Sequence, residues 1–117
     1  MDDPAEHALV CKALTCGVTG CVEWDPKAAI KVRREHCHLK GLTPEGIQED
    51  LIDSVTNRGG QVRQVKEKRP EYSHRTYWYK VIIPYVDLFR KGLFVEMELF
   101  DPDPDYPVVH LLNAHEN

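Results

Sequence analysis

The sequence predicts an α+β domain: a short N-terminal β segment, then two helices packed on one face of a mainly antiparallel, four-stranded sheet. Three observations lead to this prediction. The 117 residues are 42% hydrophobic and 29% charged, which is typical of one globular domain with a single core. Two stretches with helix-start signals come early in the chain. Four stretches of strand-forming composition follow them, and such an order favours antiparallel pairing with the helices on one sheet face. We expect this single domain to span residues 1–117.

The first 22 residues are expected to contribute only the short β segment. Residues 1–7 are mostly polar, so we expect them to fray at the chain end. Gly17 and Gly20 predict a turn between two short strands, the first near residues 8–11 and the second near 18–22.

The first predicted helix begins after Asp25. An aspartate at this position can accept hydrogen bonds from the free amide groups of a helix start, and Pro26 suits the first helical position. The helix is expected to reach about Leu39, where Gly41 provides a C-terminal stop.

The second predicted helix has the clearest signals. Thr43 is the expected N-cap and Pro44 the first helical residue. Ile47, Leu51 and Val55 recur every four residues and form one apolar stripe, and the stretch ends at Asn57 before two glycines.

After Gly60 the hydrophobic period changes from helical to alternating. We expect four strands, at residues 61–68, 74–84, 93–100 and 106–114. The proline-rich stretch between the last two strands, residues 101–105, is expected to form a turn.

Charge is strongly segregated along the chain, although the net charge is only −4. Residues 26–40 carry about +4 and residues 58–91 about +6, whereas the last 26 residues carry about −6. Local basic surface decides whether phosphates are attracted. One reading is therefore a protein with a basic, phosphate-binding face, and the other is a surface whose charges only interact with solvent.

No apolar run approaches the about 20 residues that a membrane helix needs. The N-terminus has neither the basic flank nor the apolar stretch of a signal peptide. We therefore expect a cytoplasmic protein without a membrane partner.

The four cysteines leave three interpretations open. Cys11, Cys16 and Cys21 are evenly spaced, and Cys37 lies between His36 and His38, so a zinc site is loosely compatible with the sequence. There is no C-x-x-C pair, and a disulfide or ordinary reduced thiols are the alternatives. We favour ordinary thiols, with no metal site and no cofactor.

Residues 58–80 combine cations with aromatic side chains. The cations are Arg63, Lys66, Lys68, Arg69, Arg75 and Lys80, and the aromatic residues are Tyr72, Tyr77, Trp78 and Tyr79. Recognition of single-stranded RNA requires this combination, since cations bind phosphates and aromatic rings stack on bases. The alternative is a hairpin whose outer face is basic and whose aromatic side chains belong to the core. Among the histidines outside this tract, His115 near the chain end is the candidate for acid–base chemistry, or an idle exposed residue.

Three segments resemble known toxin families. Residues 23–36 begin Glu-Trp-Asp, continue with Lys-Ala and end in a basic stretch, similar to the opening of BrnT-type toxins, which are RelE-like ribonucleases of bacterial toxin–antitoxin systems. Residues 72–81 resemble the Y-S-D-H-x-x-W-Q-D-V segment of the motility quorum-sensing regulator (MqsR) toxins. The strand after Gly92 is similar to the one that follows in those proteins, except that Phe94 replaces a tyrosine and Glu96 a cation.

This resemblance implies a RelE-like fold and a metal-independent endoribonuclease, or a descendant of one, with RNA as substrate and an antitoxin protein as partner. The chain end, residues 112–116, is similar to the I-S-A-R that closes the last strand of BrnT-type toxins, and His115 falls where those families have Arg or Lys. The resemblance therefore implies catalytic roles for His115, Lys66 and Tyr79. It also implies RNA-binding roles for Arg63, Lys68, Arg75, Tyr77 and Lys80. Two other functions stay open: a non-enzymatic module that binds a protein or small ligand through the aromatic side chains of residues 72–79, and a small zinc-stabilised domain. The oligomeric state is left open.

Overall fold

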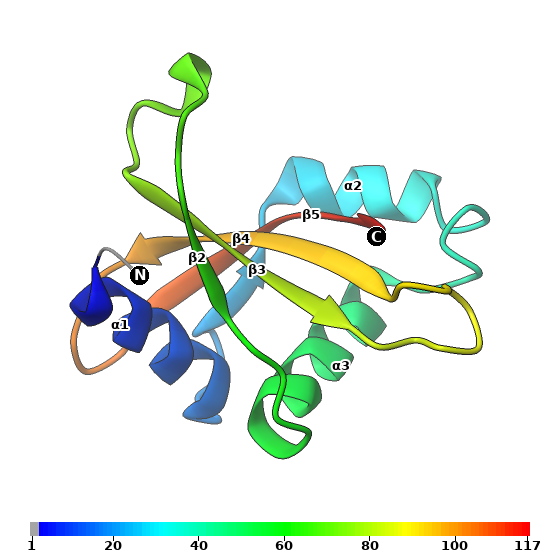
Figure 1. The fold of residues 1–117 in the computed structure, drawn as a ribbon, viewed down its shortest axis with the longest axis horizontal. Coiled ribbons are helices and arrows are strands. Elements are labelled where there is room, and N and C mark those ends of the chain that lie inside the picture. The colour runs from blue at the N-terminus through cyan, green and yellow to red at the C-terminus, as the bar shows by residue number, and fades with distance from the viewer. Residues whose placement is uncertain (1–2) are drawn as a thin grey trace.

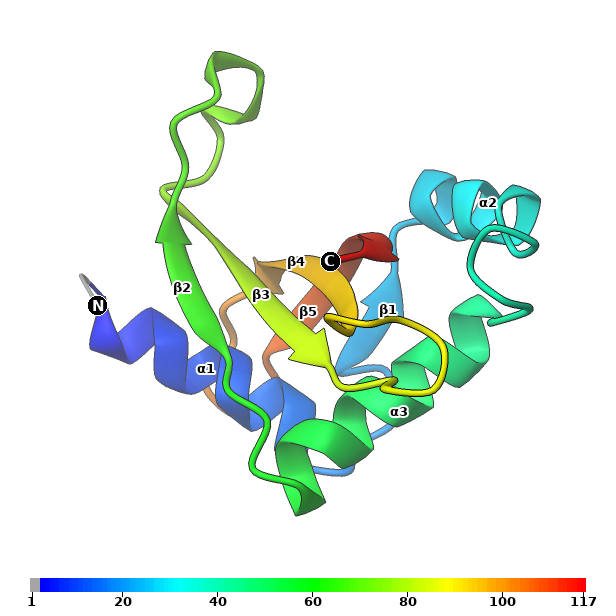
Figure 2. The same cartoon turned by 45° about the vertical axis from the view of Figure 1, so that its right-hand side comes forward.

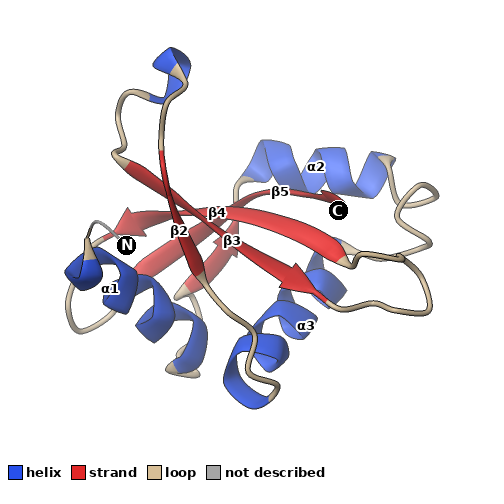
Figure 3. Cartoon of the chain, viewed as in Figure 1, coloured by secondary structure: helices blue, strands red, loops and turns tan. Residues whose placement is uncertain are grey.

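The computed structural model describes residues 3–117, which form three helices and five strands in an α+β arrangement (Figures 1 and 3). Their order is α1 (Pro4–Thr15), β1 (Val22–Trp24), α2 (Pro26–Arg34), α3 (Pro44–Asn57), β2 (Arg63–Lys66), a 3₁₀ turn (Pro70–Tyr72), β3 (Tyr77–Ile83), β4 (Leu93–Asp101) and β5 (Val108–Glu116). The predicted fold class is therefore confirmed at the level of α+β.

The sheet has five strands in the order β1-β5-β4-β3-β2, and it is mixed. The prediction of a four-stranded antiparallel sheet was wrong in this respect. The four later strands pair antiparallel, but β1 adds to the far edge parallel to β5, with Val22 opposite Val109. Backbone hydrogen bonds from Val109 N to Cys21 O (2.8 Å) and from Asp25 N to Leu111 O (2.9 Å) bracket this short pairing.

The N-terminus is helical, so the expectation of a frayed start followed by two strands was wrong for residues 3–15 (residues 1–2 lie outside the described chain). The Asp3 side chain caps α1 by accepting a hydrogen bond from Glu6 N at 3.0 Å, and Pro4 takes the first helical position. Val10 and Leu14 are buried, which fixes the helix against the core. In the described part of this region the one strand is β1 (Val22–Trp24), which shares only Val22 with the second expected strand.

The other two helices begin where predicted. Asp25 accepts from Ala28 N at 3.1 Å and Thr43 accepts from Gly46 N at 3.1 Å. However, α2 ends at Arg34, five residues before the expected Leu39, and turns follow in which Lys40 and Gly41 both have positive φ. In α3, by contrast, the predicted apolar stripe is confirmed. Ile47 and Leu51 are 0% exposed, and Val55 is half-buried against the core.

The core lies between the sheet and the two helices α1 and α3, on what we call the covered face. The buried residues of this face of the sheet are Tyr79, Val81, Ile83, Leu93, Val95, Met97, Val109, Leu111 and Ala114. Two helices do pack on one sheet face, but they are α1 and α3, whereas α2 lies beside β5. No helix in residues 3–117 is long and apolar enough to cross a membrane.

On the opposite side of the sheet, the open face, residues of α2, β4, β5 and the β2–β3 connection line a cleft, and we call this side the valley (Figure 2 shows how these elements are arranged). One wall is α2, and the other is the connection between β2 and β3, residues 67–76, which we call the arm. The floor consists of β4 and β5. Side chains that alternate away from the core on these strands therefore point into a groove that no helix fills.

Candidate functional site on the open sheet face

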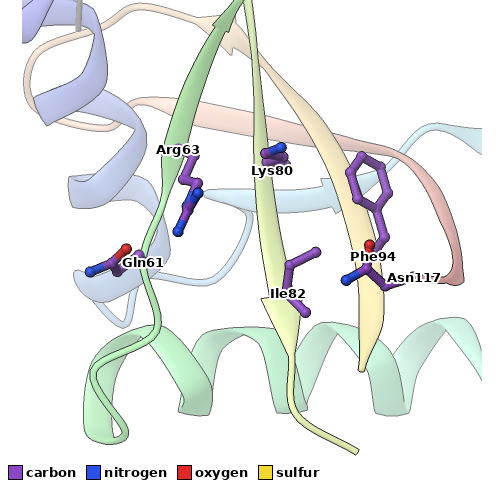
Figure 4. A pocket seen from close by; sticks show the side chains of 6 residues that line it. All are labelled: Gln61, Arg63, Lys80, Ile82, Phe94 and Asn117. Atoms are coloured by element: carbon purple, nitrogen blue, oxygen red, sulfur yellow. The ribbon is translucent and has the colours of Figure 1, made fainter. Parts of the chain in front are cut away.

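One end of the valley carries a hollow of about 400 Å³, which we call the corner (Figure 4). It is lined by Gln61, Arg63, Lys80, Ile82, Phe94 and Asn117. Strand register brings its two cations together, because Arg63 lies directly opposite Lys80 in the β2–β3 pair. Asn117 is held at the corner by a hydrogen bond from its backbone N to Gly92 O at 3.0 Å.

His115 belongs to the corner through Phe94. The two residues are cross-strand partners, and their rings stack with centroids 4.7 Å apart and planes 19° from parallel. The imidazole Nδ1 lies 3.0 Å from the carbonyl oxygen of Glu116. Because a carbonyl only accepts, Nδ1 carries the proton in this contact, which leaves the lone pair of a neutral imidazole on Nε2. The exposed ring is thereby oriented with its lone pair free, next to the Phe94 side of the hollow that Arg63 and Lys80 also line.

The middle of the valley is a larger cleft of about 520 Å³ between α2 and the arm, the α2 cleft. Lys27 and Lys31 line it from α2. They are four residues apart, so they lie on one side of the helix, and neither forms an ion pair within the described residues. Sequence analysis did not single out these two lysines, although the capped helix start and the +4 charge of residues 26–40 pointed to that helix.

The arm wall of the cleft is held by a cluster of charges at the junction of the arm with β4. Arg75, only 8% exposed, donates to Glu98 at 2.7 Å and to Glu67 at 3.1 Å, and it approaches Glu96 at 3.5 Å. Arg69 bridges Glu67 at 3.1 Å and Glu96 at 3.3 Å. Burial alone would raise the pKa of Glu67, but the hydrogen bonds from Arg69 and Arg75 outweigh this and lower its pKa.

This charge cluster has a consequence for ligand binding. Two arginines are matched by three carboxylates, so Arg75 has no charge to spare for a phosphate, contrary to its implied RNA-binding role. The guanidinium groups of both arginines also lie over the ring of Tyr72, at 4.5 Å for Arg69 and 4.6 Å for Arg75. The cluster therefore fixes the arm and its aromatic side chain in place.

The three implied catalytic residues do not share a face. Tyr79 is completely buried on the covered face, where its hydroxyl accepts from Gln64 Nε2 at 2.7 Å and donates to Glu6 at 3.0 Å. Lys66 lies on the same side, opposite Tyr77 in the register, but exposed. The structure therefore separates both residues from His115 by the thickness of the sheet.

Tyr79 has a structural role in this position. Its environment raises the pKa of the hydroxyl, chiefly through burial and also through the hydrogen bond to Glu6. The same contacts tie α1 to the sheet, since Gln64 also accepts from Asp3 N at 3.0 Å. A phenol held in this way keeps its proton and cannot reach a ligand in the valley.

The remaining implied RNA-binding residues are distributed over the molecule. Arg63 and Lys80 meet at the corner, as described above. Lys68 is exposed on the arm, and Tyr77 is half-buried against the core on the covered face. Two of the five residues, Arg63 and Lys80, therefore line the hollow beside His115.

The cysteines are free thiols in different settings. Cys21 is buried and Cys11 partly so, and burial raises the pKa of both thiols, which makes them poor nucleophiles. Within residues 3–117 no group of three or more His, Cys, Asp or Glu side chains could hold a metal ion. The zinc-stabilised alternative therefore finds no donor set in the described chain.

Comparison with known proteins found no match: no family model, no curated protein and no solved structure corresponds to this chain.

Proposed function

We propose that the protein binds single-stranded RNA along the valley and cleaves it at the corner, as a metal-independent, toxin-like endoribonuclease. The observation that carries this proposal is the position of His115. It stacks on Phe94 at the edge of a hollow lined by Arg63 and Lys80, with its Nε2 lone pair available. Cleavage of RNA without a metal needs a base that removes the 2′-hydroxyl proton and cations that stabilise the negative charge on the phosphate. The imidazole and the two cations of the hollow can take these roles.

The valley supplies the features that single-stranded RNA needs. Four of its cations, Lys27, Lys31, Arg63 and Lys80, form no ion pair within residues 3–117 and are available to phosphates. Phe94 packs near Trp78, with ring centroids 6.1 Å apart, and gives the floor an aromatic strip on which bases can stack. The acidic character of the whole chain does not oppose this, because the acids on the floor are paired with arginines of the arm.

The reaction would use the ribose of the substrate as its own nucleophile. His115 Nε2 takes the proton of the 2′-hydroxyl, and the 2′-oxygen attacks the adjacent phosphorus. The bond from phosphorus to the 5′-oxygen then breaks, leaving a 2′,3′-cyclic phosphate and a 5′-hydroxyl. Arg63 and Lys80 stabilise the additional negative charge on the phosphate, and the Lys80 ammonium provides the proton for the leaving oxygen.

The relation to RelE- and BrnT-type toxins is part of this proposal. The α+β arrangement is compatible with it, and the short sequence resemblances at residues 23–36 and 72–81 support it. A cognate antitoxin would then inhibit the protein by covering the valley, with acidic side chains opposite the four unpaired cations.

The decisive experiment is an RNase assay with single-stranded RNA in the presence of EDTA. We expect cleavage products with 2′,3′-cyclic phosphate ends, no cleavage where a 2′-deoxy nucleotide replaces the reacting ribose, and a loss of at least about 100-fold in His115→Ala. His36→Ala is the matched control, since His36 is equally exposed but follows α2 and lines neither hollow. An equally active His115→Ala protein would refute the proposed site.

A second candidate function is a binding module that has kept the valley but does not cut. The separation of Lys66 and Tyr79 from His115 favours it, because two residues with implied catalytic roles lie outside the valley. In that case the folded protein binds single-stranded RNA without cleaving it at any pH between 5 and 8, and its expression does not arrest bacterial growth.

A further inference from the structure

The floor of the α2 cleft carries polar atoms that the proposed cleavage does not use. Glu96 and Glu98 each bind the arginines of the arm through one carboxylate oxygen, Oε2. Their second oxygens, Oε1, form no hydrogen bond with the described residues. Neither of these two oxygens is fully buried. The side chains are 12% and 15% exposed, so two fixed acceptors face the cleft.

A hydrogen-bond donor lies next to these acceptors. Asn113 is the cross-strand partner of Glu96 and also lines the cleft. Its Oδ1 accepts from Ala114 N at 3.0 Å, which fixes the orientation of the amide and leaves the two N–H groups of Nδ2 for a ligand. An irregularity in the β4–β5 register between Glu96 and Met97 places Leu112 beside Asn113 on the same cleft surface.

The walls of the cleft match the rest of a nucleotide. Arg69, whose side chain is 41% exposed, lies over the ring of Tyr72 with its guanidinium carbon 4.5 Å from the ring centroid, so both groups are on the arm side of the cleft. Guanidinium planes and aromatic rings both stack on nucleobases. On the other side, Lys27 and Lys31 provide two unpaired ammonium groups for a flanking phosphate.

From this arrangement we infer that the α2 cleft reads one nucleobase of the RNA, and that this base carries an exocyclic amino group, which excludes uracil. The inference rests on the proposed RNA binding and adds base selectivity to it. Cytosine, adenine and guanine each present an amino group next to an unprotonated ring nitrogen. The amino group donates to Glu96 and Glu98, and the ring nitrogen accepts from Asn113 Nδ2. Uracil has no amino group, and its one N–H donor lies between two carbonyl oxygens, so it can satisfy only one of the two carboxylate acceptors.

Selectivity can be measured with heptamers that are uridine at every position except the central one. The central nucleotide is C, A, G or U, and 2′-O-methyl sugars prevent cleavage. We expect the wild-type protein to bind the C, A and G heptamers about tenfold more tightly than the U heptamer, as one well-formed base contact provides.

Two substitutions test the assigned atoms. Asn113→Asp keeps the acceptor for Ala114 N but replaces the donor, so the ratio of C to U affinity should fall to about one. Glu98→Gln introduces an amide donor opposite the uracil carbonyl, so the same ratio should also fall. Glu71→Gln is the matched control, because Glu71 lies on the arm next to Tyr72 but does not line the cleft, and its ratio should stay at the wild-type value. Thermal melting of each variant shows that it is folded, and the ratio within one variant is independent of any general loss of affinity.

The outcomes separate the two proposals. Equal wild-type affinity for all four heptamers would overturn base reading in the α2 cleft and leave RNA binding standing. A wild-type selectivity that survives both Asn113→Asp and Glu98→Gln would also overturn it. No binding of any heptamer by the folded wild-type protein would overturn the proposed function, and base reading with it.

Discussion

On the covered face of the sheet, the few polar side chains connect one element to another, whereas on the open face most polar side chains are presented to the valley. Tyr79 and Lys80 illustrate the contrast, because they are neighbours in β3 on opposite faces. Tyr79 is fully buried and hydrogen-bonded to Gln64 and Glu6, while Lys80 lines the corner without an ion pair in the described chain. The same strand therefore uses a polar group for stability on one side and, in the proposed function, for RNA binding on the other.

The charge cluster of the arm is the exception on the open face. Glu67 and Arg75 are 2% and 8% exposed, as buried as many core residues. Burial, rather than the face alone, therefore decides whether a polar residue stabilises the fold. Four predictions test this distinction, beginning with the largest expected effect.

The substitution Arg75→Ala should lower the free energy of unfolding by about 3–5 kcal/mol, although the residue is on the open face. It leaves Glu67 and Glu96 with only Arg69 as a partner and Glu98 with only His74, and a buried charge without its partner is strongly destabilising. Urea unfolding measures the change. Arg90→Ala is the control, since Arg90 is exposed and forms no ion pair within residues 3–117. A loss in Arg75→Ala no larger than in the control would mean that the cluster does not hold the arm.

The second prediction compares Leu111 and Leu112, which are adjacent in β5 and lie on opposite faces of the sheet. Leu111 is 0% exposed on the covered face, so Leu111→Ala should cost about 2–5 kcal/mol of unfolding free energy. Leu112 is only half-buried and lines the α2 cleft, so Leu112→Ala should cost less than about 1 kcal/mol. The same unfolding assay serves for both. Similar costs for the two substitutions would contradict the assignment of the faces.

These assignments show how much of the fold could be predicted from sequence. The α3 helix, its Thr43 cap and the four antiparallel strands were predictable, because their signals lie within a few residues of one another. The cap of α1 was equally local, since Asp3 and Pro4 repeat the pattern of Asp25 and Pro26, but the polar composition of the chain start favoured fraying. The pairing of β1 was not predictable, because its three residues pair with a strand more than 80 positions later.

The site could be predicted only in part. Period-two alternation in a strand already separates Tyr79 from Lys80, so a shared catalytic role for Tyr79 and residues facing the valley could have been excluded from the pattern. The placement of Arg63, Lys80 and His115 around the corner depends on the register of three strand pairs. No pattern within a few residues predicts that register. For the same reason, the pairing of Arg75 with three glutamates remained invisible in the sequence.

The third prediction concerns Tyr79→Phe, which should lower the free energy of unfolding by about 1–2 kcal/mol and leave RNA cleavage unchanged. The substitution removes the hydroxyl that joins Gln64 and Glu6, and these groups lose a buried partner. Because the folded state raises the pKa of Tyr79, the stabilisation is present below about pH 10 and is lost as the pH rises further. The unfolding free energy of the wild type should therefore fall more steeply above about pH 10 than that of Tyr79→Phe.

Tyr79→Phe should not abolish the loss of stability at alkaline pH, because Tyr85 also contributes to it. Burial and its hydrogen bond to Asp50 raise the pKa of Tyr85 too, so Tyr79→Phe should retain part of the alkaline loss. A Tyr79→Phe protein that is as stable as the wild type but cleaves RNA much more slowly would contradict the structural role and return Tyr79 to the list of catalytic candidates.

The last prediction has no expected effect on stability. The double substitution Lys27→Ala/Lys31→Ala removes two exposed, unpaired charges from the wall of the α2 cleft, so the free energy of unfolding should change by less than about 0.5 kcal/mol. Affinity for single-stranded RNA at low salt should fall roughly tenfold. The slope of log affinity against log salt should become less steep by about 1.4, since each lost phosphate contact removes about 0.7.

The matched control is Lys66→Ala/Lys68→Ala, which removes the same charge from exposed residues that line neither the corner nor the α2 cleft. Long-range attraction of RNA depends on total charge and would weaken equally in both variants, whereas direct phosphate contact in the valley weakens only in the first. The difference between the two salt slopes thus isolates the contribution of the open face. A larger slope change in Lys66→Ala/Lys68→Ala would place the RNA along the edge strand β2, on the covered side of the sheet, and would favour the catalytic role that sequence resemblance implies for Lys66.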